Sequence, residues 1–214
     1  MNHNLFSLIV HIFSDPIPGD VGFVYLFGQT EDNQFSVLEK GVELQQKGYS
    51  IMVSGNKEGS GYPGYAAWSG YFRKKGATPP FPIIQERYAP ANTLTEAENL
   101  VRHLAETGIE KVGIVAAPFH QLRAFFTTVG VILKNQEKIF TEHRLEIKAY
   151  SMPGAPLLWN EEVIHSQGIT RGRRRDLLIS EWEKTNSYIQ KGDIPSSTRV
   201  FEYLEWRESV EAVR

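Results

Sequence analysis

The chain has 214 residues, a length that allows one well-buried domain and leaves little room for two. Hydrophobic residues make up 41% and charged residues 22%, which is typical of a globular protein rather than a disordered one. The formal net charge of −2 provides no general attraction to nucleic acid or to an anionic membrane. There are no cysteines, which excludes disulfides, thiolate metal ligands and a cysteine nucleophile and fits a reducing compartment.

The first apolar stretch of the chain is Leu5–Phe13. It is far shorter than the roughly 20 residues that a membrane-spanning helix needs. It also has no basic leader and no small-residue cleavage site, so it does not resemble a signal peptide. We expect a strand or short helix packed on the edge of the domain, in a cytoplasmic protein without a membrane partner.

Short apolar runs then alternate with helical patterns. Strands are predicted at Val21–Phe27, Tyr49–Val53, Phe81–Gln85, Lys111–Ala117 and Leu145–Tyr150. Helices are predicted between them at Gln34–Lys47, Tyr65–Lys75, Thr93–Thr107 and Phe119–Leu133. Charged residues alternate with apolar ones in the last strand, which predicts an edge or half-exposed position. Strand followed by helix, four times over, predicts an α/β fold with a mostly parallel sheet of about five strands.

The pattern changes after Ser151. Helices are predicted over Arg171–Gln190 and Ser197–Val210. They would form a helical C-terminal extension, residues 161–214, that packs on the sheet domain of residues 1–160 or makes a homo-oligomer contact. The basic run 171–175 is balanced by nearby acids and lacks stacking aromatics, so a solvated or subunit-facing helix start is favoured over a nucleic-acid site.

In a parallel sheet, ligands bind beyond the carboxyl ends of the strands, where the strand-to-helix loops gather. The loops 28–33, 54–64, 86–93 and 117–120 should therefore share one rim. Gly28-Gln29 and Ser54-Gly55 are candidate ligand-binding pairs, in which Gly28 and Ser54 would shape the backbone, and Glu86 is a candidate acid/base group.

Two further segments on this rim carry chemistry. Thr93 and Glu96 have the spacing of a capping box, which accounts for both without a ligand and leaves Asn92 and Asn99 unexplained. The helix start itself would favour an anionic or polar ligand group.

His120 and Arg123 lie three residues apart, on one face of the next helix. The histidine can transfer a proton near neutral pH, and the arginine can hold a phosphate or carboxylate. The alternative is a histidine near a helix start beside a surface arginine.

Several common sites are unsupported. Gly28-Gln29-Thr30 is no dinucleotide fingerprint, and neither a P-loop nor a G-x-S-x-G nucleophile elbow occurs. The six histidines show no paired metal-ligand spacing, so no metal site is predicted.

The order of the rim motifs resembles the YdcF/SanA-like family over roughly residues 20–150. The shared pieces are a strand ending at Gly28, Val53-Ser54-Gly55, Ile83 to Glu86, Asn92 to Asn99, and Pro118 to Ala124. The resemblance implies a Rossmann-like three-layer sandwich with these loops lining a pocket. Some members are associated with bacterial envelope maturation, and others with adenosyl-type or nucleotide-like ligands such as S-adenosylmethionine.

Two departures from that family stand out. Its members often have paired glycines after the first strand and an arginine at the start of the first helix, where this chain has Gly28-Gln29 and a neutral segment. The missing arginine weakens the carry-over of a phosphate-binding role. The membrane anchor of the SanA-type members is not found in this sequence.

Two main hypotheses follow. In the first, the protein is an enzyme or enzyme-like binder of a small anionic or nucleotide-like metabolite, with transferase or hydrolase activity. Asn92, Asn99, Gly28 and Ser54 would orient the ligand, Arg123 would hold its negative group, and His120 would transfer a proton. In the second, the same pocket belongs to a non-catalytic sensor whose C-terminal helices bind a partner. Nucleic-acid binding through the run 171–175 is a third, weaker alternative.

Overall fold

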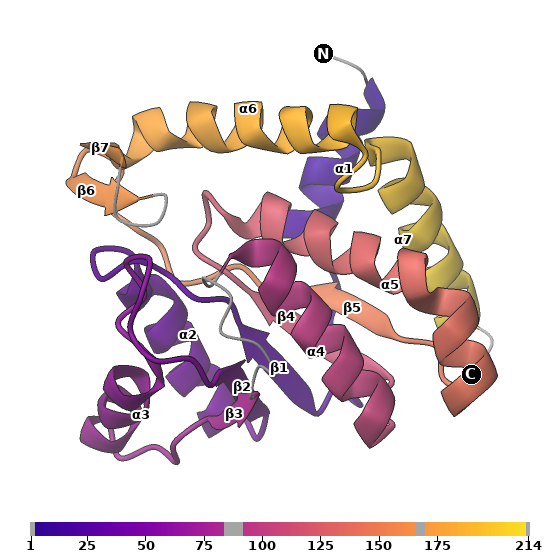
Figure 1. Cartoon of the computed structure of the whole chain (residues 1–214), viewed down its shortest axis with the longest axis horizontal. Helices are drawn as coiled ribbons and strands as arrows, with labels where there is room; N and C mark the ends of the chain where they lie inside the picture. Colours follow the sequence, from indigo (N-terminus) through magenta and orange to yellow (C-terminus); the bar gives the residue numbers. More distant parts are fainter. Residues whose placement is uncertain (1–2, 84–91, 166–169, 213–214) are drawn as a thin grey trace.

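A computed structural model describes residues 3–83, 92–165 and 170–212. Five parallel strands form the central sheet: β1 (Phe23–Leu26), β2 (Ser50–Ser54), β3 (Phe81–Ile83), β4 (Lys111–Val115) and β5 (Lys148–Ser151). Their order across the sheet is β3-β2-β1-β4-β5 (Figure 1). The predicted α/β fold is therefore confirmed, and it is a Rossmann-like three-layer sandwich.

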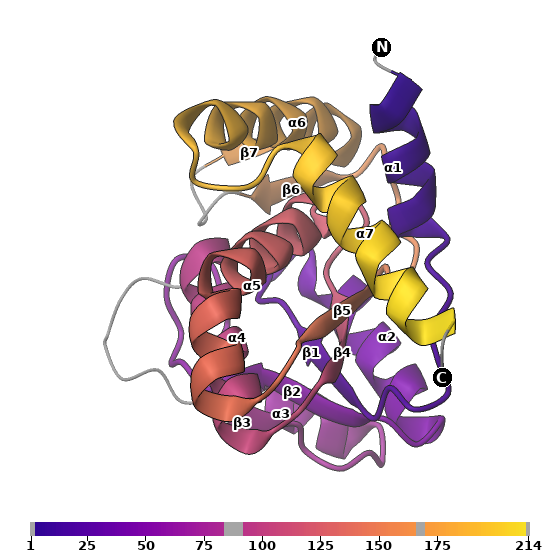
Figure 2. The same ribbon diagram turned by 90° about the vertical axis from the view of Figure 1, so that its right-hand side faces the viewer.

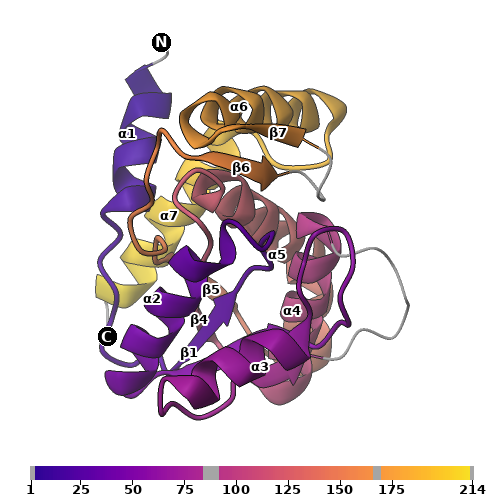
Figure 3. The ribbon, with the colours of Figure 1, turned by 90° about the vertical axis from the view of Figure 1, so that its left-hand side faces the viewer.

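Helices cover both faces of this sheet. On one face lie α2 (Gln34–Gln46) and α3 (Tyr65–Lys74), which stand in front of the strands in Figure 3. On the other face lie α4 (Thr93–Thr107) and α5 (Gln121–His143). Each face of the sheet has its own hydrophobic core, and successive residues of β1 point into one and then the other. Val24 and Leu26 pack with α2 and α3, whereas Tyr25 packs with α4 and α5.

The remaining elements come from the two ends of the chain. They are α1 (His3–Phe13), the antiparallel hairpin of β6 (Glu162–His165) and β7 (Thr170–Arg173), α6 (Arg174–Lys191) and α7 (Ser197–Ala212). Helices α1 and α7 lie side by side on the outside of the molecule (Figure 2). Residues Leu8, Ile12, Val200 and Leu204 of these helices are buried in the same core as α4 and α5.

The N-terminal stretch is a helix, one of the two structures predicted for it. Two other predictions need correction: α5 continues to His143, well past Leu133, and the extension after Ser151 is not wholly helical. The segment 162–173 forms a hairpin, and the helix predicted from Arg171 begins at Arg174. The hairpin has no alternating apolar pattern, since β7 is polar and half-exposed to exposed throughout, so hydrophobic periodicity could not reveal it.

Strand β5 lies at the edge of the sheet, which confirms one of the two predicted positions, and its four residues are buried. Helix α7 and the residues after α1 cover its open side with side chains. Tyr203 Oη accepts a hydrogen bond from the Ala149 amide at 2.7 Å, and Asp15 accepts one from the Ser151 amide at 2.8 Å. Arg207 donates to the Ala149 carbonyl at 2.7 Å. Side chains thus satisfy the backbone groups that another strand would otherwise pair with.

The buried charge of Lys148 has a similar explanation. Its Nζ lies 3.0 Å from Glu211 of α7, and Nζ of Lys111 lies 2.7 Å from the same carboxylate. The hydrogen bond from Lys111, with that from Lys148, lowers the pKa of Glu211 to about 2. A paired lysine can occupy a position that the sequence pattern marks as exposed.

Among the described residues, no helix combines the length and the hydropathy that crossing a membrane would require.

The Arg207–Asp15 ion pair provides a test of this edge. Both side chains are buried, and Arg207 Nη1 lies 2.8 Å from Asp15 Oδ2. Removing one partner leaves the other charge buried, so we expect Arg207→Met to lower the free energy of unfolding by about 3–5 kcal/mol in urea denaturation. The control is Arg199→Met on the same helix, whose ion pair with Glu202 is exposed and should contribute less than about 1 kcal/mol. Equal effects of the two substitutions would contradict this account.

Candidate functional site

The strand order creates a topological switch point at the carboxyl edge of the sheet. Strands β1 and β4 are neighbours, yet the chain leaves them in opposite directions, to β2 on one side and to β5 on the other. Such a switch point separates the two following loops and is where open α/β sheets bind ligands. Here the loops carry Gln29 and His120, the residues that follow β1 and β4.

These two side chains meet at the switch point. The Gln29 amide nitrogen lies 2.8 Å from His120 Nδ1, and both residues are buried, with 4% and 5% of their surface exposed. An amide nitrogen can only donate, so Nδ1 accepts and the ring proton is assigned to Nε2. His120 Nε2 in turn lies 3.2 Å from Thr93 Oγ1, at the start of α4. Three strand-to-helix connections therefore converge on one imidazole.

Helix α4 is capped by Asn92, whose Oδ1 accepts a hydrogen bond from the Thr95 amide at 2.9 Å. The capping box predicted for Thr93 and Glu96 is wrong, because Thr93 is already the first helical residue. This finding exchanges the roles that the sequence predicts. Helix capping accounts for Asn92, which the sequence left unexplained, whereas capping does not account for Thr93 and Glu96.

Glu96 is a buried carboxylic acid beside the first loop. It accepts hydrogen bonds from the Gly28 amide at 2.9 Å and from the Tyr25 hydroxyl at 3.3 Å. Burial raises its pKa to about 7, against the opposing effect of those two hydrogen bonds. A Cβ atom at Gly28 would lie 2.9 Å from the Glu96 carboxylate, so the glycine allows this close approach.

Arg123 connects the site to the C-terminal extension. Its Nη1 donates to Thr93 Oγ1 at 2.6 Å, and its Nε donates to Glu181 of α6 at 2.6 Å. Glu181 also accepts a hydrogen bond from Lys184 Nζ at 3.2 Å. The predicted anion-holding arginine therefore lies on the rim, already paired with a carboxylate of the protein itself.

The other predicted site residues lie around this cluster or away from it. Ser54 is buried at the end of β2, where its carbonyl accepts a hydrogen bond from the Tyr62 hydroxyl at 3.1 Å. Gly55 packs against β3, its amide donating to the Ile83 carbonyl at 2.9 Å. Asn99 contacts Arg102 within α4, and no contact described for it reaches the cluster. Glu86 lies outside the described residues.

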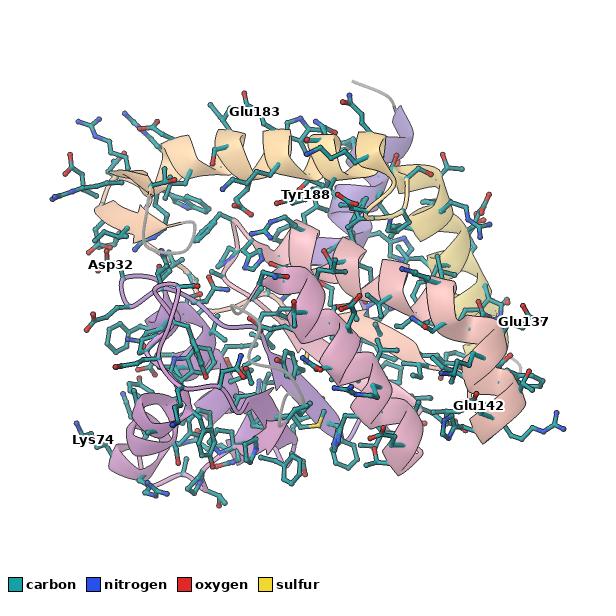
Figure 4. All side chains as sticks on the ribbon, viewed as in Figure 1. Asp32, Lys74, Glu137, Glu142, Glu183 and Tyr188 are labelled. Atoms are coloured by element: carbon teal, nitrogen blue, oxygen red, sulfur yellow. The ribbon has the colours of Figure 1, made fainter. Side chains whose placement is uncertain are left out.

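The β6–β7 hairpin lies against the loop after β1. Thr30 Oγ1 donates to the Ile164 carbonyl at 2.7 Å, and the Ile164 amide donates to Asp32 at 2.7 Å. Figure 4 shows Asp32 below the hairpin, at the tip of its loop. Arg174 is fully buried and donates to Asn33 Oδ1 at 2.9 Å and to Glu161 at 2.9 Å.

The basic run 171–175 is thus only partly the solvated helix start that the sequence predicts. Arg171 and Arg175 are exposed, while Arg174 is buried against the loop after β1.

Sequence reasoning missed Tyr25, Tyr62 and Glu181. Tyr25 lies within an apolar run, where an aromatic residue is expected in a strand for packing alone. Glu181 lies in a polar helix far along the chain from Arg123, and only the folded chain brings the two together. Among the described residues, no cluster of side chains has the composition of a metal site.

The chain matches no protein-family model, no curated protein and no solved structure. The geometry of the site is therefore what supports a function.

The raised pKa of Glu96 predicts an unusual pH dependence of stability. Between about pH 4.5 and 7 the unfolded chain has lost a proton that folded Glu96 still binds, so stability falls as the pH rises through this range. Glu96→Gln removes this group. We expect the loss of unfolding free energy between pH 5 and pH 8 to shrink by roughly 2–3 kcal/mol in urea denaturation.

The matched control is Glu106→Gln, at an exposed position of the same helix. This control should keep the pH dependence of the unmodified protein. An unchanged pH slope in Glu96→Gln would show that Glu96 titrates as an ordinary exposed carboxyl.

Proposed function

We propose that the protein binds a small anionic or nucleotide-like metabolite at the switch point between β1 and β4. The observation that carries the proposal is the convergence of Gln29, Thr93 and His120, from three different strand-to-helix connections, on one buried hydrogen-bonded network. A fold alone requires no such network at the edge of its sheet, where loops normally face water. Family membership remains a proposal of the same kind, because the resemblance to the YdcF/SanA-like family rests on the motifs alone.

The chemistry of the network suits a polar ligand and proton transfer. His120 presents an imidazole whose ring proton is assigned to Nε2, and burial raises the pKa of Glu96 to about 7. A carboxyl group that titrates near neutral pH can both give and accept a proton, and imidazole is the side chain that most often transfers one. We therefore assign His120 and Glu96 as the acid/base pair of a transferase or hydrolase reaction, with Thr93 and Gln29 positioning the imidazole.

The negative group of the ligand belongs next to Arg123. That guanidinium lies at the N-terminal end of α5, within hydrogen-bonding distance of Thr93 at the start of α4. A phosphate or carboxylate at this position would meet the charge of Arg123 and the positive ends of two helix dipoles. The ligand would compete with Glu181 for the guanidinium. Because its attraction to Arg123 is ionic, added salt should screen this attraction and weaken binding.

A second candidate function is a non-catalytic sensor that uses the same site. The favouring observation is the Arg123–Glu181 ion pair, which joins the site directly to α6. A ligand that competes for Arg123 would change how the C-terminal helices are held. Ligand affinity without turnover would identify the sensor, whereas turnover that requires His120 would identify the enzyme.

Thermal-shift screening with nucleotides, adenosyl compounds including S-adenosylmethionine, and sugar phosphates tests the proposal. A ligand at one hundred times its Kd stabilises the native state by about 2.7 kcal/mol, which corresponds to a rise in Tm of roughly 5–10 °C for a chain of this size. We expect His120→Gln to reduce the shift at least by half. The control is His143→Gln, an exposed histidine at the far end of the same helix.

Equal Tm shifts in the unmodified protein, His120→Gln and Arg123→Gln would place the ligand elsewhere and overturn the proposed site.

A further inference from the structure

Arg123, which contacts Thr93 at the switch point, also lines an apolar cavity. This cavity has a volume of about 400 Å³, within the range of small-molecule sites. The cavity lies between α1, the start of α5 and α6, and Figure 2 shows α6 and α1 next to one another above α5. Its walls are mostly aromatic and aliphatic, including Phe13, Phe119, Leu122, Trp159, Leu178 and Trp182.

The mouth of the cavity exposes large apolar side chains to solvent. Phe13, Trp159 and Leu178 are each at least 41% exposed although they belong to three separate segments of the chain. Single exposed apolar residues are ordinary on protein surfaces, but several that gather around a hollow indicate a binding site. Two tryptophans in the wall offer flat surfaces to an aromatic or alkyl group.

The charged residues that line this cavity are Arg123 and Glu181. Glu181 accepts hydrogen bonds from two cations, Arg123 Nε at 2.6 Å and Lys184 Nζ at 3.2 Å. Arg123 is the cation among the lining residues, and its planar guanidinium can hold a phosphate or carboxylate through two parallel hydrogen bonds. The cavity therefore combines an apolar wall with a group that recognises anions.

We infer that the ligand of this protein is an anionic amphiphile, with its anionic group at Arg123 and its alkyl or aryl part in the cavity. The inference deepens the proposed function and rests on it, since Arg123 contacts Thr93 at the switch point and also lines the cavity. It names the substrate class that the switch-point site alone leaves open. A purely polar phosphate compound would leave the apolar walls without a function.

Isothermal titration with octyl phosphate, methyl phosphate and octanol tests this inference. Each buried methylene gives about fourfold in affinity, so octyl phosphate should bind more than tenfold tighter than methyl phosphate. It should also bind more than tenfold tighter than octanol, which has the alkyl chain without the anion. Equal affinities for octyl and methyl phosphate would overturn the inference.

Two neighbouring substitutions locate the alkyl chain. Leu178→Glu places a negative charge at the mouth of the cavity, and Ile179→Glu places the same charge on the adjacent residue of α6, which is not a lining residue. The two positions are 47% and 63% exposed, so neither change should prevent folding. We expect Leu178→Glu to weaken octyl phosphate binding more than tenfold and Ile179→Glu to weaken it less than twofold.

The pattern of results separates the two proposals. If His120→Gln weakens methyl phosphate binding while Leu178→Glu and Ile179→Glu act alike on octyl phosphate, the amphiphile fails and the switch-point site stands. If His120→Gln changes no affinity, the switch-point site fails. Concentration-dependent dimerisation that Leu178→Glu abolishes, without binding of octyl phosphate, would show that a second copy of the chain covers the cavity and would overturn the inference.

Discussion

The strand order of the central sheet is the constraint on which the candidate site depends. Because β1 and β4 are neighbours whose connections leave in opposite directions, the loops that follow them separate at the carboxyl edge of the sheet. The side chains of Gln29 and His120 hydrogen-bond to one another at this point. The imidazole therefore owes its position, its assigned tautomer and its contact with α4 to the topology of the sheet rather than to any local sequence motif.

The terminal segments of the chain cover the edge of the sheet and the loops of the site. Helix α7 and Asp15 satisfy the open edge of β5 with side-chain hydrogen bonds, and α1 and α7 add to the same core as α4 and α5. The hairpin and α6 lie over the loops of the site, anchored by Arg174 and by the Arg123–Glu181 ion pair. The outer face of α6 carries exposed residues such as Glu183, which points away from the body of the protein in Figure 4. Residues far apart in sequence thus determine how the site is enclosed.

The sequence predicts the sheet and its helices because their patterns are local. Apolar runs and a period of 3.6 residues identify β1, α4 and β4 to within a few residues. It also predicts the rim on which His120 and Arg123 lie, since parallel strands bring their following loops to one edge. Contacts between distant residues leave no such pattern. The partner of Glu96 is the amide of Gly28, and the partner of Arg123 is Glu181, and each pairing depends on tertiary packing. The burial of Lys148 beside Glu211 and the polar hairpin at 162–173 could not be predicted for the same reason.

The most direct measurement follows the imidazole itself. Long-range ¹H–¹⁵N correlation spectra would be recorded while the protein is titrated with nucleotides, adenosyl compounds, sugar phosphates and octyl phosphate. A ligand at the switch point must disturb the contacts of His120 with Gln29 and Thr93. The account predicts that at least one of these compounds shifts both ring nitrogens of His120 while those of His143 stay fixed. Binding that leaves the His120 resonances unchanged with every compound would contradict it.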